Sequence, residues 1–320
     1  MLKKILKYSA SVALAAVLLW FSFRDVEWAK FLEGLKECNW WFILLSMAAG
    51  AFAFWLRGLR WRQLLLPIDP QTKRITTFNG INIGNISNFV FPRIGEFVRC
   101  GVIVKRGKIS YDKVLGTVVL ERGWELLVML MMLALVLVIG FNRFGTFFVE
   151  NIWNPMSDKF NMAWLLALAI AACTAAVYAI WKLRDRYAIC GKIAGIFKGI
   201  MGGLASCLHM EKKWKFFFYT LLIWMTYWFM ASCTVWAAPF LSHLDAIDAL
   251  FLSLVGGLGF AIPVPGGIGA FHYIIALTLS TVYNVEAETA LVYATISHTS
   301  QAITQIIFGL FSYSYEAIRK

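Results

Sequence analysis

Long apolar runs separated by short polar stretches dominate the chain. A helix needs about 20 predominantly apolar residues to cross a membrane, and runs close to that length recur from one end of the sequence to the other. The pattern predicts an all-α membrane protein with about six spanning helices. These are expected at residues 5–23, 40–56, 114–140, 162–181, 216–239 and about 287–313.

Two further apolar segments, 78–104 and 249–281, are interrupted by glycine and proline. Non-helical backbone survives at membrane depth only where protein or a water-filled cavity shields it. We therefore expect each segment to form a re-entrant helical hairpin. The alternative is a kinked full span for each half, which would bring the total to eight or more spans.

The distribution of basic residues sets the expected orientation. With the N-terminus in the cytoplasm and both hairpins returning to their starting side, most of the 30 Lys and Arg residues face the cytoplasm, as the positive-inside rule requires. Both termini are then cytoplasmic. The hairpin 78–104 enters from the cytoplasm and the hairpin 249–281 enters from the exterior.

The two hairpins share a short sequence pattern. Residues 92–97 resemble residues 265–271 with one residue inserted. Similar sequences that enter a membrane from opposite sides suggest inverted-topology repeats, a device of transporters. The single membrane domain 1–320 would then consist of a first repeat, 1–140, and a second, 162–320. An amphipathic cytoplasmic connector, 183–214, would join them.

Composition agrees with a membrane location. Hydrophobic residues make up 60% of the chain and charged residues only 15%, with a mean hydropathy of +0.69, which argues against a soluble enzyme or a disordered protein. In this setting the net charge of +12 indicates loops that face anionic lipid rather than nucleic acid. The six cysteines lack CxxC spacing and the four histidines lack a carboxylate cluster, so we expect no metal and no cofactor.

Charged residues inside apolar segments are the first candidates for function. Glu121, Arg122 and Glu125 lie inside the run 114–140, and ionisable groups at membrane depth usually mark a functional site. Arg93, with the free N–H groups of a helix that starts after Pro92, suggests a phosphate-binding site. The alternative is an ion-pair cluster that only fixes packing.

Uncharged polar groups supply further candidates. Asn79, Asn82, Asn85 and Asn88 recur every three residues, so they form a polar stripe that lines a wet path or bonds to neighbouring helices. The second hairpin contributes a Gly- and Pro-rich break and two histidines. The expected substrate-binding residues are Arg93, Glu96, Arg99, Glu121, Arg122, Glu125, Asn85, Asn88, Pro265, Gly266, Gly267, Gly269, His272, His298 and Gln301.

These motifs together resemble the lysylphosphatidylglycerol synthase transmembrane (flippase-like) family, which includes the membrane half of the multiple peptide resistance factor. The resemblance rests on residues 88–99, 121–125 and 263–269 and extends over about 5–315. It implies a lipid translocase that forms a homodimer. Fused members carry an aminoacyl-transferase domain, whereas this sequence stops at Lys320 without one, so we do not expect it to make the lysyl-lipid itself.

Two positions depart from the family pattern. His272 stands where the family usually has an acidic residue, and Glu125 stands where it has an aspartate. The first change leaves the headgroup of the transported lipid open, whereas the second is conservative.

The sequence thus favours a lipid flippase or scramblase of the bacterial inner membrane. Its expected partners are a membrane phospholipid and a separate lipid-modifying enzyme. One alternative is an intramembrane enzyme that modifies lipid headgroups with Glu121 or His272 as acid–base. Another is a non-catalytic lipid-binding subunit in envelope lipid synthesis.

Overall fold

The computed structural model describes residues 2–24, 26–107, 109–149 and 210–319, together with Asn154 and Lys182. These residues form eleven α-helices and two short 3-10 helices, with no strand among them, so the predicted all-α fold is confirmed for the described part of the chain. The expected span 162–181 lies outside the described residues, as does nearly all of the expected connector 183–214.

Four helical segments of the described chain are long and apolar enough to cross a membrane. Three of them match predicted spans: α3 (Trp40–Leu65), α6 (Tyr111–Ile139) and α11 (Lys213–Ala237). The fourth, Pro265–Tyr283, belongs to the second hairpin. The described residues therefore yield four candidate spans where six were predicted for the whole chain.

Two other predicted spans form helices but are not among these four. α1 (Leu2–Phe23) contributes only the shorter apolar stretch Ser11–Phe23. α14 (Ala287–Ile318) is long enough, but polar side chains interrupt its apolar sequence. Several of these side chains bond to α3 and α4, so they are satisfied within the protein.

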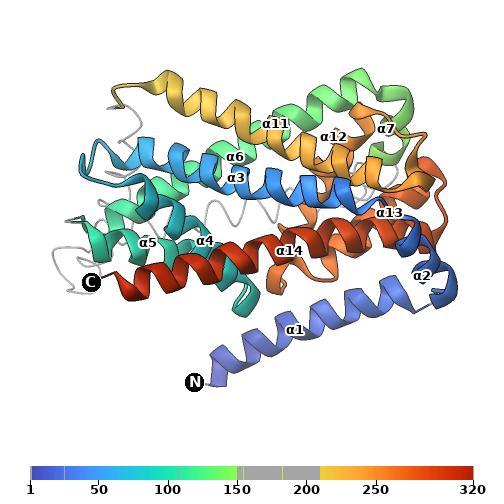
Figure 1. The fold of residues 1–320 in the computed structure, drawn as a ribbon, viewed down its shortest axis with the longest axis horizontal. Coiled ribbons are helices and arrows are strands. Elements are labelled where there is room, and N and C mark those ends of the chain that lie inside the picture. The colour runs from blue at the N-terminus through green and yellow to red at the C-terminus, as the bar shows by residue number, and fades with distance from the viewer. Residues whose placement is uncertain are drawn as a thin grey trace.

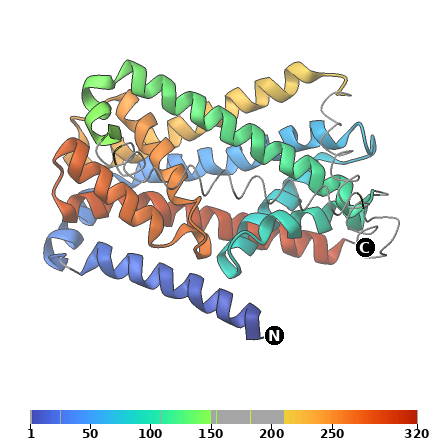
Figure 2. The same cartoon turned by 180° about the vertical axis from the view of Figure 1, so that it is seen from behind.

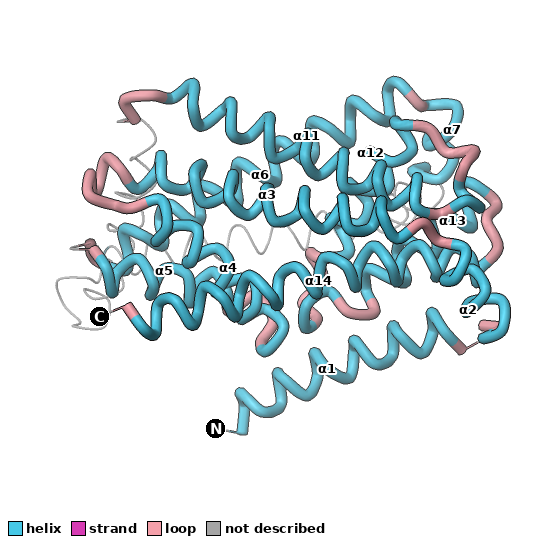
Figure 3. Tube along the Cα trace, viewed as in Figure 1, coloured by secondary structure: helices cyan, strands magenta, loops and turns pink. Residues whose placement is uncertain are grey.

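The two interrupted segments form helical hairpins within a few residues of the predicted bounds. The first consists of α4 (Arg74–Val90) and α5 (Gly95–Arg106). The second consists of α12 (Ala246–Gly259), the 3-10 turn η4 (Pro265–Gly267) and α13 (Ala270–Tyr283). Figures 1 and 2 show that the hairpins come from opposite ends of the bundle and that their tips meet near its middle. In the tube view of Figure 3 the two tip loops lie on the same side of the molecule.

Glycines permit the close approaches that these hairpins require. A side chain at Gly95 would collide with the backbone carbonyl of Gly84, so α4 and α5 pack backbone to backbone. Gly269, before α13, has a φ of 81°, which L-amino acids with a side chain rarely adopt. A Cβ there would lie 2.6 Å from the carbonyl oxygen of Ala15 in α1.

Short elements close the end of the bundle opposite the C-terminus. α2 (Trp28–Glu37) lies beside α14 there, with α7 (Phe141–Phe148) and η3 (Pro239–Leu241). Asp245 caps α12 with a capping box, and Arg143 donates to its carboxylate at 2.7 Å. This hydrogen bond lowers the pKa of the Asp245 carboxyl and ties α7 to the base of the second hairpin.

Each hairpin packs into a separate buried apolar cluster. Under the first hairpin, Trp61, Leu64, Ile81, Ile103 and Val118 pack together. Under the second, a separate cluster gathers α12, α13, α14 and the end of α11, and it includes Leu252, Phe271, Ile275, Leu279 and Tyr293. The polar groups described below lie beside these two cores.

Candidate functional site

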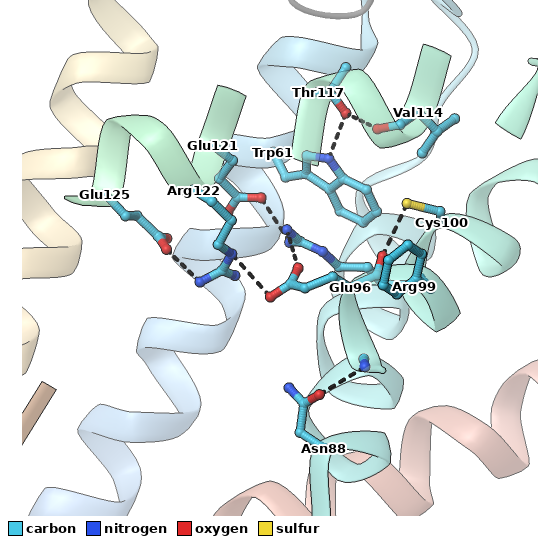
Figure 4. Close-up of polar contacts among 12 residues, drawn as sticks. Trp61, Asn88, Glu96, Arg99, Cys100, Val114, Thr117, Glu121, Arg122 and Glu125 are labelled. Atoms are coloured by element: carbon cyan, nitrogen blue, oxygen red, sulfur yellow. Dashed lines mark hydrogen bonds and ion pairs between the residues drawn. The ribbon is translucent and has the colours of Figure 1, made fainter. Parts of the chain in front are cut away.

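Six charged side chains form a closed ring of ion pairs beside the first hairpin. Three are arginines and three are glutamates, and they come from α3, α5 and α6. In order around the ring they are Arg60, Glu121, Arg99, Glu96, Arg122 and Glu125, each of which contacts the next. We call this set the charge ring. Figure 4 shows its members from α5 and α6.

Each carboxylate in the charge ring bridges two guanidinium groups. Glu121 lies 2.9 Å from Arg60 and 2.7 Å from Arg99, nitrogen to oxygen. Glu96 lies 2.7 Å from Arg99 and 3.0 Å from Arg122. Glu125 lies 2.6 Å from Arg122 and also pairs with Arg60. The formal charges of the six side chains cancel. The ring therefore joins three helices without leaving a net charge inside the bundle.

Burial of the charge ring is graded from one side to the other. Arg60 and Glu121 are fully buried and Arg99 is 2% exposed. The other three side chains are more accessible, at 19% for Glu125, 27% for Glu96 and 39% for Arg122. A buried charge costs several kcal/mol unless it is paired, and here every buried charge has two opposite partners. In the part of the chain that the structure describes, the ring is accessible from the side of Glu96, Arg122 and Glu125.

Aromatic rings cover the buried side of the charge ring. The Arg99 guanidinium lies 4.7 Å from the centroid of the Trp61 ring, and that of Arg60 lies 5.8 Å from the Phe216 ring. Trp61 is itself fixed by a 3.0 Å hydrogen bond from its indole nitrogen to Thr117. Such cation–π contacts add stabilisation where water is excluded.

Arg60 is a site residue that the sequence prediction missed. The predicted span ended at residue 56, so the arginines after it were assigned to a cytoplasmic loop. Instead, α3 continues to Leu65. The available signal was helical spacing. Arg60 continues the buried stripe of Ser46, Gly50 and Ala53, whose successive intervals are four, three and seven residues.

Arg93 does not join the charge ring. It lies at the tip of the first hairpin with a φ of 62°, and its guanidinium donates to the backbone carbonyl of Ala261 at the tip of the second hairpin. The first N–H of α5, that of Gly95, donates to the Asn88 side chain at 2.8 Å. Arg93 and the first N–H of α5, two of the groups expected to hold a phosphate, therefore already have partners within the protein.

The asparagine stripe of α4 bonds mainly to α14. Asn79 donates to Glu316 at 2.7 Å and Asn82 donates to Ser312 at 3.2 Å. Glu316 also pairs with Arg106 at the end of α5, at 2.8 Å. Asn85 keeps a buried amide nitrogen without a hydrogen-bond partner among the described residues. The stripe thus anchors the first hairpin to α14 over part of its length.

The polar residues of the second hairpin divide into two groups. His272 and His298 lie together, and His298 contacts the carbonyl of Gly266 at 2.9 Å through Nε2. Gln301 instead donates to Ser46 in α3 at 3.3 Å. Pro265, Gly266 and Gly267 form the 3-10 turn at the tip, and Gly269 precedes α13. Of the expected residues, the tip turn and the two histidines are in contact, whereas Gln301 bonds elsewhere.

No group of three or more His, Cys, Asp or Glu side chains within the described ranges has the arrangement of a metal site. The charge ring itself offers guanidinium and carboxylate groups. These bind phosphate and ammonium groups, respectively, through charge-assisted hydrogen bonds.

Comparison with known protein families identifies a related membrane region. Residues 8–309 match the profile described as the lysylphosphatidylglycerol synthase TM region. The match is to this membrane region, and no catalytic synthase domain is found in the chain. Searches of curated proteins and of solved structures return no match.

Proposed function

The chain belongs to the lysylphosphatidylglycerol synthase transmembrane family, and on this premise we propose that it translocates a lipid headgroup across the bacterial inner membrane. The protein is a multi-pass membrane protein. In our proposal the two hairpins are re-entrant and belong to inverted repeats. The lipid headgroup passes between them while the acyl chains stay in the bilayer.

The observation that carries this proposal is the meeting of the hairpin tips. The hairpins come from opposite ends of the bundle (Figures 1 and 2), and Arg93 of one bonds to Ala261 of the other. Transporters with inverted repeats place their substrate site near the bilayer midplane, where broken helices meet. Each hairpin would then form one half of a headgroup path.

The charge ring is the proposed headgroup site on the side of the first hairpin. A headgroup phosphate would bind Arg122, its most accessible cation, and a cationic group would bind the carboxylates thereby released. Exchange of partners within a neutral ring avoids the large cost of an unpaired buried charge. Arg60 also keeps two nitrogens, Nε and Nη1, without hydrogen-bond partners among the described residues.

The proposed orientation places the C-terminal end of the bundle in the cytoplasm. Lys73, Arg74, Lys105, Arg106 and Lys213 lie at the helix ends that point this way. Lys30, Lys36 and Arg143 lie towards the other end. The bias follows the positive-inside rule.

Purified protein in liposomes tests the function. The vesicles carry fluorescent phosphatidylglycerol or phosphatidylethanolamine, and a membrane-impermeant reductant bleaches only the label in the outer leaflet. We expect the inner-leaflet label to become accessible with the wild-type protein and much more slowly with Arg122→Ala. The matched control is Arg143→Ala, which removes an exposed arginine far from the ring. Equal rates in empty vesicles and in protein vesicles would refute translocation of these lipids.

Chemical analysis of the same vesicles separates the proposed function from its alternatives. A translocase leaves the lipids covalently unchanged, whereas an enzyme that modifies headgroups yields a lipid of new mass. A binding subunit would retain one lipid during purification without moving it.

A further inference from the structure

Two buried histidines lie side by side behind the tip of the second hairpin. His272 belongs to α13 and His298 to α14. Each side chain is 6% exposed, and the centroids of the two rings are 4.9 Å apart. We call them the histidine pair. The charge ring lies on α3, α5 and α6, so the pair is a separate group of titratable side chains.

Hydrogen bonding leaves a vacant proton position in the histidine pair. His298 Nε2 lies 2.9 Å from the backbone carbonyl oxygen of Gly266. A carbonyl oxygen only accepts hydrogen bonds, so Nε2 carries the hydrogen, and Nδ1 of a neutral His298 carries none. On His272, Nδ1 is buried and has no hydrogen-bond partner among the described residues.

The surroundings of the pair are aromatic rather than acidic. Phe260 stacks on His298 at 5.9 Å, Phe271 lies 5.6 Å from the same ring, and Phe23 of α1 lies 6.0 Å from His272. Across the described ranges, no carboxylate bonds to either ring.

Two further polar side chains lie on elements that carry or adjoin the pair, one cationic and one neutral. The first hairpin brings Arg93, whose guanidinium donates to the backbone carbonyl of Ala261, the residue after Phe260. On the α3 side, Gln301 is uncharged and bonds to Ser46. No carboxylate of the described residues thus bonds to the pair as a counter-anion for a proton. Because the rings are in contact, a second proton would be opposed by repulsion between like charges.

We propose that the histidine pair is a proton-binding site that takes up one proton together with the phosphate of the transported lipid. The proton comes from water on one side of the membrane and adds to a ring nitrogen that carries no hydrogen, such as Nδ1 of His298. The resulting imidazolium and the anionic phosphate form a neutral combination. On release, the proton returns to water on the other side. The role in transport rests on the proposed function, whereas proton binding at the hairpin tips does not.

The contacts of the pair indicate how proton uptake acts on the hairpins. His298 holds the carbonyl of Gly266, and the ring of Phe89 from the first hairpin lies where a side chain at Gly266 would be. Gly266 thus connects the histidine pair to Phe89 of the other hairpin tip. An imidazolium is costly in dry, aromatic surroundings unless water or an anion reaches it. Protonation therefore favours separated tips and deprotonation favours closed ones.

Spin labels on the two hairpin tips test this coupling. Val90 and Ala261 are exposed and are replaced by labelled cysteines in a chain whose six native cysteines are changed to alanine. The full chain is placed in liposomes of phosphatidylglycerol and phosphatidylethanolamine. From about pH 8 to about pH 5, the range in which imidazole titrates, we expect the label separation to increase.

Variants assign this response to the pair. His298→Gln keeps a donor for Gly266 but does not titrate, so we expect the pH response to disappear. The matched control is His243→Gln, since His243 is an exposed loop residue and its loss should leave the response intact. A label separation that is independent of pH in the parent chain would overturn the proposal. So would a response that persists in the double variant His272→Gln/His298→Gln.

The label measurement does not require lipid movement, which separates this inference from the proposed function. One outcome is a label separation that depends on pH through the pair in vesicles where no lipid is moved. This result would support the proton site and refute translocation of the lipids present. If lipid is moved, its rate in the parent chain should rise several-fold at the acidic end, and His298→Gln should remove that dependence.

Discussion

Arg93 and Ala261 join the two hairpins, because the guanidinium of Arg93 donates to the backbone carbonyl of Ala261. They are 168 residues apart in the sequence and belong to hairpins that come from opposite ends of the bundle (Figure 1). The bond uses a side chain on one hairpin and only backbone on the other, so Arg93 is the residue to change. Any headgroup path between the tips requires this contact to open.

Replacing Arg93 should weaken the tip contact, and the choice of replacement separates two effects. Arg93 has a φ of 62°, which costs an ordinary residue about 1–2 kcal/mol and glycine almost nothing. Arg93→Gly and Arg93→Ala both remove the bond to Ala261, but we expect Arg93→Ala to lower the free energy of unfolding by about 1 kcal/mol more. Unfolding of the purified protein in detergent measures the difference. Equal stability of the two variants would contradict this assignment of the backbone.

Breaking the charge ring at its buried side should destabilise the protein strongly. Glu121→Gln leaves Arg60 and Arg99 with one carboxylate each, and removal of one partner from a buried ion pair costs about 3–5 kcal/mol. The charge-balanced double variant Arg60→Met/Glu121→Leu should cost less than the sum of the single variants. Arg143→Ala, which breaks a pair whose side chains are 58% and 47% exposed, should cost about 1 kcal/mol or less. An additive double variant would show that the two residues are not coupled.

Two glycines on α5 provide a matched test of hairpin packing. A Cβ at Gly95 would collide with the carbonyl of Gly84, whereas a Cβ at Gly101 has nothing within 4 Å. Gly95→Ala should therefore force α4 and α5 apart and lower stability. Gly101→Ala should be neutral or stabilising by up to about 1 kcal/mol, because alanine favours the helix. The closeness of α4 and α5 would be in doubt if Gly95→Ala were as stable as Gly101→Ala.

Single cysteines at opposite ends of the bundle test the proposed orientation. Gln71, before α4, and Glu286, before α14, are both exposed. In intact bacterial cells, a membrane-impermeant maleimide should label Glu286→Cys at once and Gln71→Cys only after permeabilisation. The reverse result would invert the topology, and with it the side from which each hairpin enters.

The sequence was sufficient to locate the hairpins because their signal is local. Glycine and proline interrupt apolar runs at 92–95 and 263–269, and both breaks form the tips of hairpins. The short helix α2 (Trp28–Glu37) was not predicted, since its sequence is too short and too polar for the span pattern.

The partners of the site residues were harder to predict because they are distant in sequence. Five members of the charge ring were candidates, but Arg60 pairs with a residue 61 positions away, and nothing local shows that pairing. Gln301 was expected to be a substrate-binding residue together with His298 of the same predicted span. Its amide instead reaches Ser46, 255 positions away.

The most direct test of the account links the two hairpin tips reversibly while lipid movement is measured. Val90→Cys/Ala261→Cys in the cysteine-free chain is placed in vesicles with fluorescent phosphatidylglycerol and treated with a reducible bis-methanethiosulfonate cross-linker. The account predicts that linking the tips stops translocation and that a reductant restores it in the same sample, whereas either single-cysteine control is unaffected. Translocation at an unchanged rate through cross-linked tips would contradict a headgroup path between the hairpins.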